Sequence, residues 1–318
     1  MKLLLLLLCL LLSMPTATAE ETFSIIATNF PAFDFARTIA ADTADVRMLL
    51  PPGAESHSYE PSPQDIITIQ NCNLFIYVGG ESDTWIDSIL SSMGDEAPPV
   101  FRLADCVTML SSVTTQSMEE LHAHEHDESC ADHDHSYEEN HHHDMDEHVW
   151  TSPKNVMLIV SELEKVLSEI RPEHKDAYAK SAGDYLLELQ ELDAAFEKIV
   201  AEGERDVIIF GDRFPFRYFA AAYGLAYDAA FPGCSEASEP SVRTVISLID
   251  NIRTQNIPVV FYIEFSSRRT ADILSEETGA KPLLFHSCHN VSTEEIEAGA
   301  TYLKLMWQNT IALKEALH

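Results

Sequence analysis

The chain has 318 residues, with 52 acidic residues against 20 basic ones and a formal net charge of −32. This length accommodates two domains of ordinary size, and an apolar fraction of 46% is sufficient for globular cores. The charge argues against a nucleic-acid-binding protein, because phosphates would be repelled, and it fits a soluble protein that attracts cations.

The first residues, MKLLLLLLCLLLSMPTATAE, are typical of a secretory signal peptide, with one lysine, a leucine-rich run and the small-x-small site Ala17-Thr18-Ala19. The alternative is a membrane anchor, but an apolar run of about a dozen residues is too short to span a bilayer comfortably. We expect residues 1–19 to be removed near Ala19, and the mature protein to be periplasmic or otherwise extracytoplasmic. No later segment is long and apolar enough to cross a bilayer.

Strand-like and helical patterns alternate through the first third of the chain. The expected strands lie at 22–31, 46–52, 74–80 and 99–107, and the expected helices at 33–42, 61–72 and 85–93. This alternation predicts a mostly parallel sheet flanked by helices. With the amphipathic helix expected at 152–170, these segments form an N-terminal α/β lobe at residues 20–172.

The second half repeats the alternation. Between Glu173 and Ala201 apolar residues recur every three or four positions, and we expect one long helix at 173–203 that joins two lobes. The C-terminal α/β lobe is expected at 204–318. Its strands are predicted at 206–212, 258–265 and 282–288, and its helices at 215–225, 241–255, 268–279 and 294–317.

A low-complexity stretch rich in His, Asp and Glu runs from about Ser111 to Glu147. Nine of the fourteen histidines lie between His122 and His148. Such a segment has too few apolar groups to offset the entropy of ordering. We predict a flexible loop that collects cations, delivers them or reports their concentration; the alternative is a spacer without function.

Five cysteines would remain after cleavage: Cys72, Cys106, Cys130, Cys234 and Cys288. An exported compartment permits disulfides, and the odd number leaves at least one thiol unpaired. Pairs within one half of the chain would be Cys72 with Cys106 and Cys234 with Cys288. Sequence does not fix the connectivity, and Cys130 in the low-complexity stretch is the expected free thiol.

Four loops carry side chains that metals favour. His57 and Asp212 each come after a predicted strand, where ligands bind in open α/β sheets; the alternative for Asp212 is an ion pair or a helix cap. His148 stands just before a helix, beside Trp150. The fourth loop holds His286 and His289, with Cys288 between them; here the alternative is a disulfide with incidental histidines.

Imidazoles at strand ends in both halves predict a metal site between the lobes, and imidazole suits zinc, while manganese would prefer more carboxylates. Water, Asp212 or Glu81 would complete four-coordination. Enzyme motifs are missing: the chain has no Gly-rich phosphate loop, no G-x-S-x-G and no H-E-x-x-H.

The order of several motifs resembles the metal-binding solute-binding proteins of bacterial ABC importers that carry zinc or manganese. These motifs are ATNFPAFDFA, PPGAESHSYEPSP, LFIYVGG, the His/Asp/Glu loop, DEHVWTSP and FRYFAAAYGL. The histidine-rich loop is similar to that of the zinc-uptake, ZnuA-like branch. The resemblance covers nearly all of the mature chain, and the HSYEPSP and HVWTSP segments are specific in combination.

The resemblance implies two α/β lobes joined by a long rigid helix. It also implies a cleft that holds Zn²⁺ for delivery to a membrane permease and its ATPase, and a monomer that is not an enzyme. His57 and His148 match the N-lobe ligands of the family. Arg213 aligns with the third ligand and cannot bind a cation. A one-residue shift would offer Asp212, and His286 would otherwise replace the missing ligand, with His289 as the alternative.

Two further functions remain open. One is a manganese or iron receptor of the same fold, against which the histidine content argues. The other is a surface adhesin or zinc-storage protein in which the histidine-rich loop is the working part. A zinc hydrolase of unfamiliar geometry is a more distant possibility.

Overall fold

The computed structural model describes residues 22–55, 58–111, 145–231, 233 and 239–318. The predicted signal peptide, His57, Cys130, Cys234 and most of the histidine-rich stretch lie outside these residues. No helix within the described part is long and apolar enough to span a membrane.

The N-terminal lobe contains a parallel four-stranded sheet in the order β2-β1-β3-β4. Its strands are β1 (Ser24–Ala27), β2 (Asp45–Met48), β3 (Leu74–Tyr77) and β4 (Val100–Arg102). Its helices are α2 (Phe30–Ala40), α3 (Pro63–Gln70) and α4 (Thr84–Met93). The capping box of Ser62 and Asp65 fixes the start of α3.

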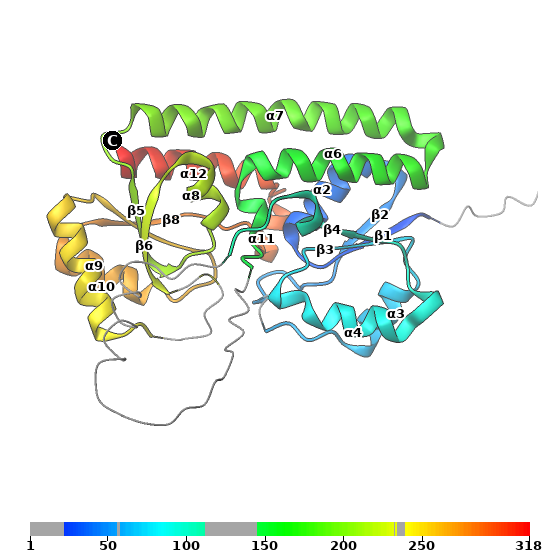
Figure 1. Cartoon of the computed structure of the whole chain (residues 1–318), viewed down its shortest axis with the longest axis horizontal. Helices are drawn as coiled ribbons and strands as arrows, with labels where there is room; N and C mark the ends of the chain where they lie inside the picture. Colours follow the sequence, from blue (N-terminus) through cyan, green and yellow to red (C-terminus); the bar gives the residue numbers. More distant parts are fainter. Residues whose placement is uncertain (1–21, 56–57, 112–144, 232, 234–238) are drawn as a thin grey trace, which may run out of the picture.

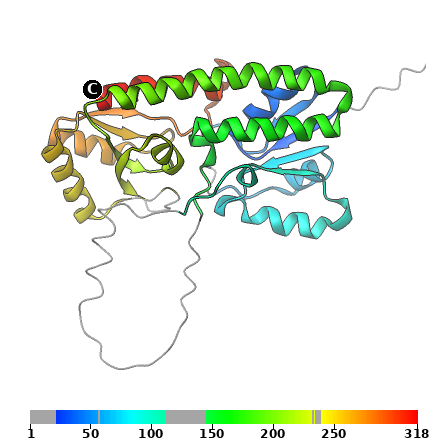
Figure 2. The same ribbon diagram turned by 45° about the horizontal axis from the view of Figure 1, so that its top comes forward.

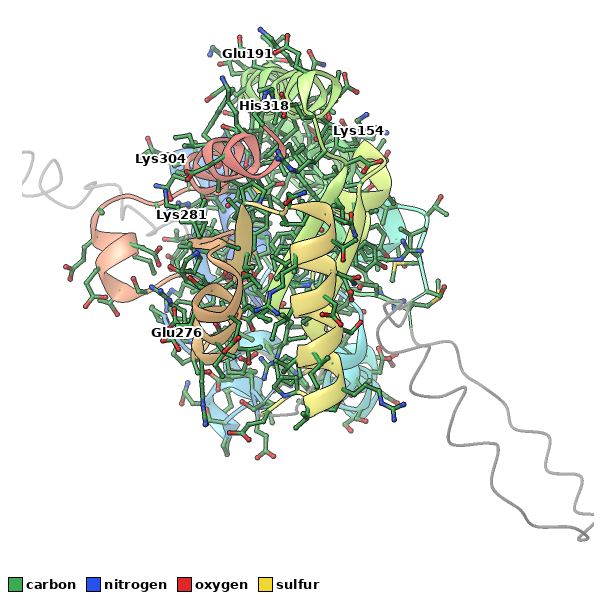
Figure 3. The ribbon with its side chains drawn as sticks, turned by 90° about the vertical axis from the view of Figure 1, so that its left-hand side faces the viewer. Lys154, Glu191, Glu276, Lys281, Lys304 and His318 are labelled. Atoms are coloured by element: carbon green, nitrogen blue, oxygen red, sulfur yellow. The ribbon has the colours of Figure 1, made fainter. Side chains whose placement is uncertain are left out.

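The C-terminal lobe contains an equivalent parallel sheet in the order β6-β5-β7-β8. Its strands are β5 (Val207–Arg213), β6 (Ala226–Phe231), β7 (Val259–Tyr262) and β8 (Lys281–Leu284). Its helices are α8 (Arg217–Tyr223), α9 (Val242–Gln255), α10 (Arg269–Thr278), α11 (Thr293–Glu297) and α12 (Tyr302–Leu317). Figure 3 shows α9 and α10 side by side, away from α12 and α7.

Two helices form a frame along one side of both lobes. α6 (Pro153–Ile170) packs on α7 (Lys175–Glu202), which also contacts α2 of the first lobe and α12 of the second. With 28 residues, α7 is about 42 Å long and extends over both sheets (Figures 1 and 2). The predicted two-lobed α/β fold and its long joining helix are therefore confirmed.

The strands bury apolar side chains on both faces, as expected for parallel sheets covered by helices. In the first sheet, Ile25 and Ile76 face the core shared with the frame helices, whereas Ile26 and Phe75 face α3 and α4. The shared core also contains Phe210 and Phe261 of the second sheet, so one apolar cluster runs through both lobes.

Buried polar contacts also connect the lobes. The Asp34 carboxylate of α2 is fully buried, accepts the backbone N–H of Tyr302 at 2.9 Å and pairs with Arg37. The Arg37 guanidinium donates to the carbonyl of Ala300. The hydroxyl of Tyr302 donates to the carbonyl of Trp150 at 2.8 Å. These bonds hold the start of α12 against the N-terminal lobe.

Three sequence expectations need correction. The helix expected at 294–317 is two helices, because Gly299 adopts a φ of 72° between α11 and α12. Strand β6 was not predicted.

The predicted disulfide between Cys72 and Cys106 is absent, and both are free thiols. Cys72 packs on the α3/α4 side of the first sheet, and Cys106 packs against the shared core on the other side. Cys288, whose predicted partner Cys234 lies outside the described residues, is a buried free thiol.

The contacts of Asp34 predict the effect of its removal. Asp34→Ala should lower the free energy of unfolding by about 2–3 kcal/mol, because the buried Tyr302 N–H and the Arg37 guanidinium lose their acceptor. Urea unfolding of metal-free protein measures this. The control Asp42→Ala removes an exposed carboxylate nearby and should change stability by less than about 0.5 kcal/mol. Equal effects of the two changes would contradict the role of Asp34 in joining the lobes.

Candidate metal site

Two imidazoles from different parts of the chain meet in a small cavity between the lobes. The rings of His148 and His289 have their centroids 5.5 Å apart and are perpendicular. They line a cavity of about 30 Å³, large enough for an ion or a single water. The other lining residues are Ala54, Glu55, Arg213, Pro215, Gly233, Ile263, Glu264, Phe265, Ser287 and Asn290.

His148 is held by the residues on both sides of it. The Asp146 carboxylate accepts the His148 backbone N–H at 2.9 Å and lies 3.0 Å from Nδ1 of the ring. Because a carboxylate only accepts, Nδ1 donates and the lone pair of the neutral ring is on Nε2. Burial acts to lower the pKa of His148, but the charge and hydrogen bond of Asp146 raise it above its usual value.

The segment after His148 fixes its place in the fold. The hydroxyl of Thr151 donates to the His148 carbonyl at 2.8 Å, and Pro153 begins α6. Trp150 is fully buried, and its Nε1 donates to the carbonyl of Ser287 at 2.8 Å. His148 therefore sits on a segment that is bonded directly to the loop carrying His289.

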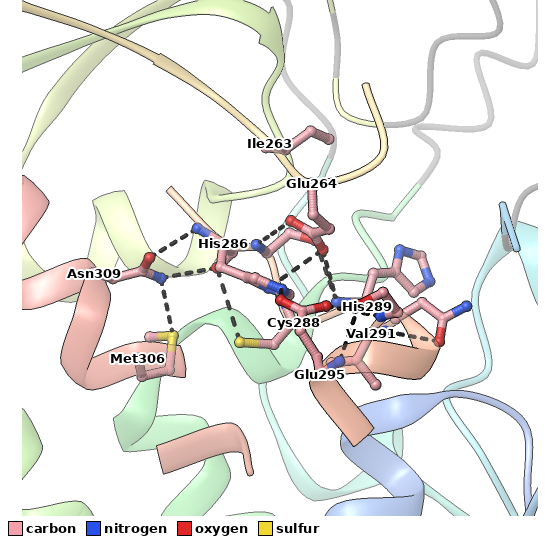
Figure 4. A network of polar contacts seen from close by, with 12 residues as sticks. Ile263, Glu264, His286, Cys288, His289, Val291, Glu295, Met306 and Asn309 are labelled. Carbon is pink, nitrogen blue, oxygen red and sulfur yellow. Dashed lines mark hydrogen bonds and ion pairs between the residues drawn. The ribbon is translucent and has the colours of Figure 1, made fainter. Parts of the chain in front are cut away.

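His289 belongs to the loop after β8, which Glu264 organises (Figure 4). The Glu264 carboxylate accepts the N–H of Ser287 at 2.8 Å, the Ser287 hydroxyl at 2.5 Å and the N–H of His289 at 3.3 Å. Cys288 adopts a φ of 60°, a left-handed conformation that is uncommon outside glycine. The loop thus turns sharply just before His289.

His286 faces the interior of the C-terminal lobe instead. Its Nδ1 accepts the N–H of Cys288 at 2.9 Å, and its Nε2 lies 3.5 Å from Oε1 of Glu295. Its backbone N–H and carbonyl are both bonded to the Asn309 amide, at 2.8 Å each. His286 does not line the cavity, so the first choice from sequence does not join His148, whereas the alternative His289 does.

The Asp212 carboxylate also accepts hydrogen bonds from the backbone. Its Oδ1 accepts the N–H of Arg213 at 2.8 Å, and its Oδ2 accepts the N–H of Ile263 at 3.1 Å. It lines a larger, adjacent cavity of about 240 Å³ and not the one that holds His148. A structural role fits this geometry better than metal ligation, although these backbone bonds are neither the ion pair nor the helix cap that the sequence offered as the alternative.

Two remaining candidates, His57 and the side chain of Glu81, lie outside the described part of the structure. Glu55, two residues before His57, lines the cavity of His148 and His289. Within the described residues alone, no group of three or more His, Cys, Asp or Glu side chains is arranged to hold a metal.

Sequence reasoning missed Asp146, Glu264 and Asn290. The composition boundary includes Asp146 in the histidine-rich stretch, yet it is 5% exposed and Glu147 is 2% exposed, so both belong to the folded lobe together with the rest of DEHVWTSP. Glu264 lies near the end of the predicted strand at 258–265 and just beyond the observed β7, so the strand-end rule that found His57 would have found it too. Asn290 is discernible only from its contacts.

The fold is that of a two-lobed solute-binding protein, and the cavity between its lobes is the candidate metal site. A family model described as "Zinc-uptake complex component A periplasmic" (ZnuA) matches residues 25–316, and the chain belongs to this family.

Relatives and solved structures agree with this assignment. The chain is 32% identical over 300 residues to the high-affinity zinc uptake system protein ZnuA of Bacillus subtilis, which covers 93% of this chain and 88% of that protein. It is 30% identical over 297 residues to the zinc-binding lipoprotein AdcA of Streptococcus pneumoniae. That match covers 93% of this chain but only 56% of AdcA, so the chain spans about half of that relative.

Among solved structures, the Zn(II)-bound ZnuA-like domain of S. pneumoniae AdcA aligns with a TM-score of 0.74 and 26% identity. The alignment covers 93% of this chain and 99% of that domain. The metal-dependent lipoprotein YcdH of B. subtilis aligns with a TM-score of 0.75 and 28% identity, over 93% of this chain and all of that one.

The contact of His286 with Glu295 predicts a pH-dependent stability difference. His286 lowers the pKa of Glu295 to about 2, and the charges of Glu264 and Glu295 outweigh burial to raise the pKa of His286 above 6.5. The Glu295 contribution is complete above its unfolded pKa of 4.5 and is lost as the pH falls toward about 2. The His286 contribution is complete below 6.5 and is lost as the pH rises through the raised pKa.

Glu295→Gln keeps an acceptor for the capping box of α11 but removes the charge. Its destabilisation should therefore be greatest between pH 4.5 and 6.5 and should shrink toward either extreme. Urea unfolding of wild type and variant at pH values below, within and above this range, with a chelator present, measures it. A destabilisation independent of pH would show that the carboxylate and the imidazole do not interact as charges.

Proposed function

We propose that this protein is a zinc receptor that captures Zn²⁺ outside the cytoplasmic membrane and delivers it to an ABC-type permease and its ATPase. It would act as a monomer and catalyse no reaction of its own. The observation that carries this proposal is the convergence of His148 and His289, from the two halves of the chain, in an ion-sized cavity. Membership of the ZnuA family supports the transport role.

We propose His148 and His289 as two of the metal ligands and His57 as the third. His57 lies outside the described residues, and its assignment rests on the sequence motif and on Glu55, which lines the cavity two positions earlier. Three imidazoles form a neutral, borderline-soft ligand set, which favours zinc over manganese. Asp146 would act behind His148, orienting the ring and increasing the basicity of Nε2.

The two histidines after β8 provide a direct test. His289→Ala should abolish tight, stoichiometric zinc binding in an isothermal titration, because it removes a ligand from the cavity. His286→Asn retains a side-chain acceptor for the Cys288 N–H and should keep the tight site. Thermal unfolding of both metal-free variants shows whether they fold. Loss of tight binding in a folded His286→Asn, with retention in His289→Ala, would reverse our assignment.

A second test addresses the carboxylate behind His148. Asp146→Ala should weaken zinc binding by roughly 10–100-fold, because the ring loses the partner that fixes its tautomer and orientation. Competition with a chromophoric chelator measures the affinity. Asp105→Ala removes a carboxylate that is 70% exposed and does not line the cavity, and it is the matched control. An unchanged affinity in Asp146→Ala would exclude Asp146 from the site.

A further inference from the structure

Arg213 brings a positive charge into the cavity that holds the two imidazoles. It is the last residue of β5, after a register shift between Phe210 and Arg213 in the pairing with β6. Such irregularities commonly redirect a side chain beside a functional site. Within the described lining of this cavity, Arg213 is the only side chain with a permanent positive charge.

The local structure fixes Arg213 in this place. At Gly211 a Cβ would lie 2.5 Å from Cα of Ala271, so a side chain there would push β5 away from α10. Asp212 accepts the backbone N–H of Arg213 and that of Ile263, the residue that follows β7. The backbone before the guanidinium is therefore anchored on two sides, which makes the presence of Arg213 at the cavity a built feature of the fold.

The guanidinium pairs with a carboxylate of the other lobe. Nη1 of Arg213 lies 3.0 Å from Oε2 of Glu55, in the segment after β2. The two side chains are 26% and 44% exposed, so solvent screens the pair only in part. Both residues line the small cavity of His148 and also the larger cavity of about 240 Å³ beside it. The pair stands where the two cavities adjoin.

We infer that the Arg213–Glu55 pair sets the zinc affinity of the site, with Arg213 weakening binding and Glu55 offsetting it. This inference rests on the proposed zinc-binding function. The guanidinium repels a dication held by His148 and His289, while Glu55 attracts that ion and neutralises Arg213. A receptor that must release its ion benefits from a nearby positive charge that lowers its zinc affinity. Neutral imidazole ligands do not themselves repel the ion.

The sign of the mutational effects separates this role from a mechanical one. If the pair only latched the lobes over the ion, breaking it from either side would change affinity in the same direction. If it acts through charge, removing Arg213 strengthens binding and removing Glu55 weakens it. A unit charge within ~10 Å of a dication, at an effective dielectric constant of ~40, changes a binding constant by roughly tenfold.

The experiment measures zinc affinity of the full mature chain by competition with a chromophoric chelator at neutral pH and fixed ionic strength. We expect Arg213→Gln to bind roughly tenfold more tightly and Glu55→Gln roughly tenfold more weakly, with the double variant between them. Arg213→Lys keeps the positive charge, so its zinc affinity should be closer to that of the wild type than the affinity of Arg213→Gln is. Arg269→Gln breaks the exposed Arg269–Glu239 pair of the same lobe and is the matched control, with unchanged affinity.

Opposite shifts in the two single variants support the inference. Shifts in the same direction would indicate a latch, and unchanged affinities in both would remove the pair from the site; either result overturns it. These outcomes are distinct from failure of the proposed function, in which the wild-type chain itself shows no tight zinc binding. Thermal unfolding of each metal-free variant confirms that the measured proteins are folded.

Discussion

The docking of the loop after β8 onto the N-terminal lobe is the interaction on which the candidate site depends. Trp150 donates to the carbonyl of Ser287 from one side, and the Asn290 amide donates to the carbonyls of Pro51 and Ala54 from the other, at 2.8 and 2.9 Å. The N–H of Gly53 also donates to the carbonyl of Val291 at 2.9 Å. His289 lies between these anchors, so its position is set jointly by both lobes.

This docking would be weak without the helical frame behind it. α6 and α7 pack on each other and share one apolar core with both sheets, and Asp34 holds the start of α12 against α2. Burial of this continuous core supplies the driving force, whereas the buried polar contacts specify one arrangement of the lobes. The cavity can therefore be small and still have ligands from distant parts of the chain.

The sequence predicted the fold well because its signals are periodic and repeated. Alternating strand and helix patterns indicated two parallel sheets, and Pro153 and Gly224 marked a helix start and end that the structure has. Strand β6 escaped because AYDAAF consists mainly of alanine and aspartate, which are depleted in strands, and contains no β-branched residue. The break between α11 and α12 escaped because an isolated glycine in a helical pattern does not reveal its φ.

The site was predicted less completely, for a physical reason. Sequence spacing places His286 and His289 in one loop, but which of them faces the other lobe depends on the left-handed Cys288 and on the bonds of Glu264. Likewise, a boundary drawn by composition included Asp146 in the histidine-rich stretch, although its carboxylate accepts the His148 backbone N–H. Both differences depend on tertiary contacts, which spacing and composition do not reveal.

Electrostatics follow from the same geometry. The chain carries a net charge of −32, so its overall field attracts cations, yet the ligands proposed here are neutral imidazoles and the adjacent cavity wall includes a guanidinium. The acidic residues of the whole chain thus attract cations at long range, whereas the Arg213 guanidinium opposes the bound ion at short range. Glu55 belongs to the segment that Asn290 holds, so the charge balance of the cavity and the docking of the two lobes depend on the same short stretch of backbone.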